Sequence, residues 1–84
     1  ILNSLNIYPN PNTGEFTITF EIIEKQNINL RVFDIKGQTI YEKNLSDFTG
    51  KYHNKIDMSS YAKGIYNLQL IYNEGTINKK IILE

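Results

Sequence analysis

The chain has 84 residues and no cysteine, and its nine basic residues balance nine acidic ones, so the formal net charge is zero. This length suits one domain with a small core. The neutral balance argues against a nucleic-acid-binding module and against a polybasic membrane-surface patch, since both need a positive field. Without cysteine, neither a disulfide nor a thiolate metal site can support the fold.

The sequence contains no apolar run near the ~20 residues that a membrane-spanning helix needs. It begins at Ile1 and shows no basic-then-apolar leader. We therefore expect no membrane span, and we expect residues 1–84 to be a single domain of a longer protein.

The first elements in chain order are a short run over residues 5–8, which predicts an edge strand, and a stiff turn over residues 9–14. Pro9 and Pro11 each fix φ near −65° and donate no backbone hydrogen bond, so this turn cannot lie inside a sheet. Gly14 suits a positive φ. The turn either only starts the fold or presents a rigid, solvent-facing shape that a partner recognises at low entropic cost.

Apolar and polar residues alternate over residues 16–22 and again over 28–32, which predicts two strands with one buried face each. The polar residues 24–27 between them predict a turn. Asp34 and Gly37 then suit the first and fourth positions of a type I turn.

A third strand is expected near residues 38–45, followed by a loop over 46–50 and a strand over 52–58. Residues 57–64 suggest one helical turn that ends at Gly64.

The strongest strand spans residues 65–72. A tight hairpin with Gly75 at a position of positive φ leads to the last strand over 76–83. About seven short strands with frequent turn signals favour an all-β antiparallel sandwich. The two-residue period places nine residues in one core: Phe16, Ile18, Phe20, Leu30, Val32, Ile56, Tyr66, Leu68 and Leu70.

No pattern in the sequence predicts catalysis. His53 is the only histidine, so no histidine pair can hold a metal. Ser59 or Ser60 with His53 and Asp57 supplies the residue types of a hydrolytic triad, but the nucleophile elbow is absent. The carboxylates fall mostly at turns or outward strand positions, and no calcium loop occurs. We predict no enzyme activity, no cofactor and no metal.

Most of the six tyrosines and four phenylalanines lie at inward strand positions. Phe33, Tyr41, Phe48 and Tyr52 are the aromatic residues that could lie outside. An exposed aromatic row would suit a small adhesive or carbohydrate-binding sandwich, and that function stays open as an alternative. A structural spacer domain in a larger enzyme is a second alternative.

Four segments occur in a characteristic order and spacing: YPNPNTGEFTI, VFDIKGQTIYE, IDMSSYAKGIYNLQL and KKIILE. Together they resemble the type A C-terminal sorting domain of the type IX secretion system, the outer-membrane export route of Bacteroidetes-type bacteria. The resemblance covers nearly the whole chain, from about Asn6 to Glu84.

The resemblance implies an immunoglobulin-like sandwich that folds in the periplasm and sends its upstream cargo through the outer-membrane translocon. It also implies a sortase-like surface peptidase that usually removes the domain, and a secreted or cell-surface location. By the same resemblance the recognition residues are Pro9, Asn10, Pro11, Gly14, Asp34, Gly37, Gly64, Tyr66, Lys79 and Lys80.

The chain ends in Glu84, whereas many members of this family end near a basic residue, which leaves the role of a terminal positive charge open. Physical reasoning adds one expectation. If the last strand lies at a sheet edge, its free backbone groups can pair with a receptor strand. Lys79 is then expected to project outward, with Lys80 or its neighbour packing inward by its stem.

Overall fold

A computed structural model describes residues 2–84 of the chain. It contains five strands, all paired antiparallel: β1 (Leu2–Tyr8), β2 (Glu15–Phe33), β3 (Thr39–Asp57), β4 (Gly64–Tyr72) and β5 (Gly75–Leu83). Within residues 2–84 no helix has the length and apolarity needed to cross a bilayer.

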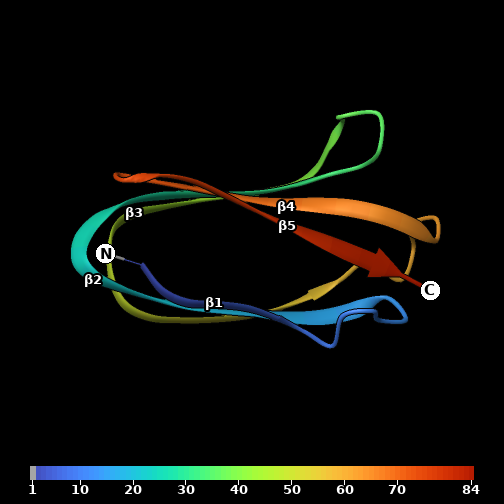
Figure 1. Cartoon of the computed structure of the whole chain (residues 1–84), viewed down its shortest axis with the longest axis horizontal. Helices are drawn as coiled ribbons and strands as arrows, with labels where there is room; N and C mark the ends of the chain where they lie inside the picture. The colour runs from blue at the N-terminus through green and yellow to red at the C-terminus, as the bar shows by residue number, and fades with distance from the viewer. Residues whose placement is uncertain (1) are drawn as a thin grey trace.

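The two long strands, β2 and β3, contribute to both layers of the sandwich (Figure 1). The first half of β2 pairs with β1 and with the second half of β3. The second half of β2 pairs with the first half of β3 and with β4, and β4 pairs with β5. The expected all-β, immunoglobulin-like sandwich is therefore confirmed, but it has five strands rather than seven.

Two predicted turns are wrong, because residues 24–27 and 46–50 lie inside β2 and β3. The strands cross from one layer to the other here, and their pairing register shifts between Ile22 and Gln26 and again between Gln26 and Ile28. Such bulges bend a strand without ending it. The polar residues that resemble a turn in the sequence are thus the ones that line a bend.

Gln26 illustrates how the polar groups of the bend find hydrogen-bond partners. Its side chain is buried, its Oε1 accepts a hydrogen bond from the backbone N–H of Asn73 at 2.8 Å, and its Nε2 donates to the carbonyl of Glu24 at 3.2 Å. Nearby, the Thr49 hydroxyl donates to the carbonyl of Ile22 at 3.3 Å. These contacts replace ladder bonds that the bend interrupts.

All nine residues predicted for the core are buried. The aromatic prediction is wrong for Tyr52, which is buried and stacks on Phe20 with ring centroids 4.8 Å apart. Phe48 packs edge-on against both rings. Because β2 and β3 lie in register here, the three rings fill the inside of the bend. Phe33 and Tyr41 are half-buried, so the four residues form no exposed row.

The predicted helical turn over residues 57–64 is also wrong. The segment is a non-helical loop with one tight turn, in which the N–H of Tyr61 donates to the carbonyl of Met58 at 3.0 Å. Asp57 acts within this turn, since its Oδ1 accepts a hydrogen bond from the N–H of Ser59. Asp and Ser favour such local bonds in loops as well as at helix ends.

The sandwich has two different ends (Figure 1). One end, here called the motif end, is formed by residues 9–14, 34–38 and 58–64 with the C-terminal end of β5, and lies at the right of Figure 1. The other, the bend end, holds the bends of β2 and β3 and the 73–74 turn. The quoted sequence segments, far apart along the chain, all reach the motif end.

Candidate functional site

Asn10 fastens the proline-rich turn to the edge of β5. Its side-chain Nδ2 donates to the carbonyl of Lys80 at 2.7 Å, and its Oδ1 accepts from the N–H of Ile82 at 2.9 Å. The amide therefore pairs with β5 as a neighbouring strand's backbone would. Pro9 and Pro11 themselves are exposed, and the peptide bonds that precede them are both cis.

Asn12 continues this pairing with its backbone. Its N–H donates to the carbonyl of Ile82 at 2.9 Å, its carbonyl accepts from the N–H of Glu84 at 2.7 Å, and it forms a parallel bridge with Leu83. Its Oδ1 accepts from the N–H of Gly14, and the residue is buried. Sequence reasoning missed Asn12, because its role depends on residues 70 positions away.

Gly14 joins the turn to the β3–β4 loop. Its φ is +130°, and a Cβ there would lie 2.9 Å from the Cα of Ser59. Its carbonyl accepts a hydrogen bond from the N–H of Met58. Only glycine fits this close approach. On the other side of the contact, hydrogen bonds from the side chain and backbone of Ser59 lower the pKa of Asp57.

The 34–37 turn forms as predicted. The N–H of Gly37 donates to the carbonyl of Asp34 at 3.0 Å, and Gly37 has a φ of +84°. The Oδ1 of Asp34 accepts from the N–H groups of Lys36 and Gln38, both at 2.9 Å. Three hydrogen bonds to one residue make this a rigid turn.

Gly64 and Tyr66 lie at the start of β4. Tyr66 is buried, and its hydroxyl donates to the carbonyl of Ala62, four residues earlier. This contact resembles the tyrosine corner of immunoglobulin-like sandwiches. Gly64 pairs with Leu83 of β5, so this corner also touches the segment that Asn12 holds.

Lys79 and Lys80 occupy opposite faces of β5. The expected outward direction of Lys79 is wrong, because its Cα pairs with that of the fully buried Leu68. Lys79 thus lies on the core-facing side at the sheet edge, and its side chain still reaches solvent. Lys80 pairs with Asn67 on the outer face and is exposed. An inward-pointing charge on an edge strand blocks unwanted strand pairing.

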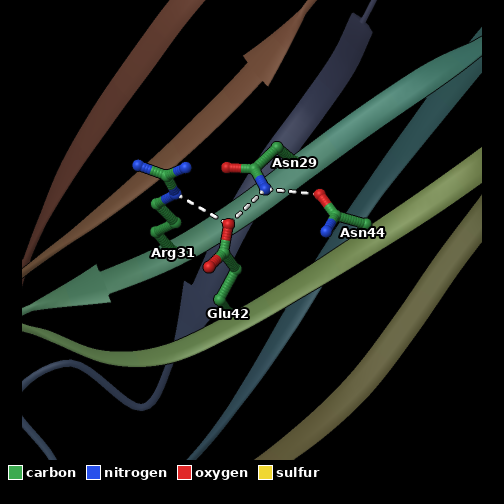
Figure 2. A network of polar contacts seen from close by, with 4 residues as sticks. All are labelled: Asn29, Arg31, Glu42 and Asn44. Atoms are coloured by element: carbon green, nitrogen blue, oxygen red, sulfur yellow. Dashed lines mark hydrogen bonds and ion pairs between the residues drawn. The ribbon is translucent and has the colours of Figure 1, made fainter.

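A separate polar network lies across β2 and β3 (Figure 2). Asn29 Nδ2 donates to Glu42 at 2.9 Å and to Asn44 at 2.6 Å, and Arg31 forms an ion pair with Glu42 at 2.9 Å. The hydrogen bond from Asn29, followed by that from Arg31, contributes most to lowering the pKa of Glu42. The network ties cross-strand neighbours together, which is a structural role.

The chain matches the sequence model of a family described as the secretion system C-terminal sorting domain, over residues 6–84. It belongs to this family.

Two curated relatives are larger enzymes. The chain is 27% identical to an endo-acting ulvan lyase of Formosa agariphila over 85 aligned positions, and covers 16% of that protein. It is 32% identical to beta-agarase D of Zobellia galactanivorans over 80 positions, and covers 15% of it. The chain thus spans about one sixth of the length of each of these two relatives.

A beta-glucuronidase of Parabacteroides merdae contains a similar fold. The TM-score is 0.68, at 12% identity, and the similarity covers 98% of this chain and 13% of the other. At this identity the comparison supports the sandwich fold alone.

The predicted absence of catalysis is confirmed by the family, because a sorting domain is a secretion signal and not a catalytic domain. The geometry agrees. His53 and Asp57 lie four residues apart on one strand, which places them roughly 13 Å apart. Asp57 instead bonds Ser59 in its own turn. The family also marks proteins that are secreted or displayed at the cell surface.

Eight of the ten predicted recognition residues lie at the motif end of this sorting domain: Pro9, Asn10, Pro11, Gly14, Asp34, Gly37, Gly64 and Tyr66. Lys80 touches the same end through Asn10, and Lys79 lies next to it at the edge. Most of the eight form the turns themselves. The exposed large apolar side chains beside them include Ile35 in the 34–38 turn and Ile65 at the start of β4.

Proposed function

We propose that residues 1–84 form the C-terminal domain of a longer secreted protein and direct that cargo through the outer-membrane translocon of a type IX secretion system. The family match over residues 6–84 carries this proposal. The chain covers only a small share of the two enzyme relatives, and this supports the proposal, since a secretion signal is expected to be a small part of the secreted protein.

The direct test is a fusion of a periplasmic reporter to Ile1 of the chain, expressed in a bacterium that has this secretion system. The reporter should reach the cell surface or the medium, whereas the reporter alone should stay in the periplasm. A folded fusion that stays in the periplasm in the presence of the translocon would rule the proposal out.

Truncation is a poor variant for this test. Residues 80–84 include the buried Ile81 and Leu83 and provide the backbone partners of Asn10 and Asn12. Deleting them is therefore expected to unfold the domain as well as to stop export. Circular dichroism of the fusion must accompany any such deletion, and point variants at exposed positions are preferable.

The second part of the proposal is that a sortase-like peptidase removes the domain after export. Mass spectrometry of the exported reporter should then find a C-terminus upstream of the domain. An exported reporter that retains all 84 residues would contradict cleavage and leave the sorting function standing.

A further inference from the structure

The motif end contains a groove of about 240 Å³ between the 34–38 turn and the start of β4. Its apolar walls include Ile35, Ala62 and Ile65, and Lys36 and Lys63 also line it. Two sequence segments that are about 30 residues apart thus build one concave surface.

Ile35 is 82% exposed and Ile65 is 52% exposed. A single exposed isoleucine is ordinary, and Ile23 at 53% is one at the bend end. Two that line the same groove form an apolar contact surface. The 34–38 turn, which carries Ile35, also projects beyond the strands (green in Figure 1), in agreement with the high exposure of that side chain.

This surface is held rigid before any partner binds. Asp34 accepts two backbone N–H groups and closes the turn that carries Ile35, and the Tyr66 hydroxyl holds the carbonyl of Ala62 on the opposite wall. A preformed apolar surface loses little conformational entropy on binding, so little of the free energy gained by burying it is offset. The motif residues Asp34 and Tyr66, which also line the groove, thus position its apolar side chains.

The charge of the groove favours an acidic partner. Lys36 and Lys63 are exposed, whereas the carboxylate of Asp34 turns one oxygen towards backbone N–H groups of its own turn. The groove therefore presents two ammonium groups and one carboxylate beside two apolar side chains, which leaves it net positive.

We propose that this groove binds a segment of another protein that carries an apolar side chain next to a carboxylate. The inference rests on the proposed function, because the partner is taken to be a component of the secretion machinery. The apolar side chain fits between Ile35 and Ile65, and the carboxylate pairs with Lys36 or Lys63, which sets partner choice.

The test uses the reporter fusion with two double variants at the groove, Ile35→Ser with Ile65→Ser, and Lys36→Glu with Lys63→Glu. Each has a matched control at the bend end. Ile23→Ser removes an isoleucine that is as exposed as Ile65, and Lys25→Glu with Lys51→Glu makes the same charge change at exposed positions. Melting curves of all variants establish that the domains remain folded.

Both groove variants should lower the exported fraction about tenfold or more, while the controls export like the wild type. Equal export from groove and control variants would overturn the inference, with the sorting function intact. If export falls with the isoleucine pair but not with the lysine pair, the inference that the partner carries a carboxylate is wrong. A wild-type fusion that is not exported would overturn the proposed function and this inference together.

A second copy of this chain is the competing occupant. Light scattering of the purified domain should find a monomer at micromolar concentration. A dimer that Ile35→Ser dissociates would assign the groove to self-association and contradict the proposal.

Discussion

At the motif end the chain reverses in tight turns that polar side chains close, whereas at the bend end β2 and β3 pass from one layer to the other without interruption. Asn10, Asp34 and Tyr66 each bond backbone groups at the motif end. At the bend end, three packed aromatic rings and the buried Gln26 do the equivalent work. One end is thus fixed mainly by polar side chains that bond backbone groups, and the other mainly by packing of aromatic rings between β2 and β3.

This difference separates stability from recognition. The bend end packs its largest side chains inside, so substitutions there should cost stability first. The motif end presents exposed isoleucines and lysines on turns that are already rigid, so substitutions of those side chains should leave the fold intact. Substitutions of the residues that shape the turns should affect both.

The largest expected effect is at the bend end. Phe20→Ala removes the ring that stacks on Tyr52 and should lower the free energy of unfolding by about 3–5 kcal/mol. Phe33→Ala is the matched control, because Phe33 is only half-buried near the motif end and should cost much less. Urea denaturation measures both. Equal losses would show that the aromatic cluster does not distinguish the bend end.

The next largest effect is at the motif end. Gly14→Ala places a methyl group against the backbone of Ser59 and forces alanine to a φ of +130°, so it should cost at least about 2 kcal/mol. Gly37→Ala shares the positive φ but meets no atom within 4 Å, so it should cost only about 1 kcal/mol. The same denaturation experiment compares them. A reversed order would mean that the contact between residues 14 and 59 is not tight in solution.

Gln26→Ala tests the polar part of the bend. It removes the acceptor of the Asn73 N–H and leaves a small cavity, with an expected cost of about 1–2 kcal/mol. Gln69→Ala, on the outer face of β4, is the control and should change stability by less than about 0.5 kcal/mol. Hydrogen exchange should also find faster exchange at Asn73 in the Gln26 variant. Unchanged exchange there would contradict the assigned bond.

The two ends also differ in how far the sequence predicts them. Proline, glycine and aspartate restrict the backbone locally, so the turns at residues 9–14 and 34–37 could be read directly. The bends at 24–27 and 46–50 have the same polar composition as turns, and only pairing with a distant strand keeps them extended. Local composition therefore misassigned them.

Individual residues follow the same rule. Asn12 could not be found from the sequence, because its partners lie at the other end of the chain. The orientation of Lys79, in contrast, could have been predicted from the sequence. Its two-residue period is shared by Ile77, Ile81 and Leu83, which are all at least partly buried. The groove could be found only in the structure, because one wall comes from the 34–38 turn and the other from residues 62–66.

The smallest expected effect is a pH dependence at Asp57 and Glu42, the two carboxylates whose hydrogen bonds lower their pKa. In the folded chain the pKa of Asp57 lies below its ordinary value of 3.8, through bonds from Ser59, and that of Glu42 lies below 4.5, through bonds from Asn29 and Arg31. Each group binds a proton more readily when unfolded. Its contribution to stability is therefore complete above the ordinary pKa and is lost as the pH falls through the lowered folded value.

Melting temperatures measured between about pH 5 and pH 2.5 should show this loss in the wild type. Asp57→Asn and Glu42→Gln should each flatten the acid limb slightly, because the replacement amides keep an acceptor oxygen but do not titrate. Glu24→Gln, at an exposed position on the bend, is the control. Both carboxylates are solvent-exposed, so salt should weaken the effect. An acid limb that neither substitution changes would show that the bonds to these two carboxylates do not contribute to stability, and the motif end would then depend on its other bonds, such as those of Asn10 and Asp34.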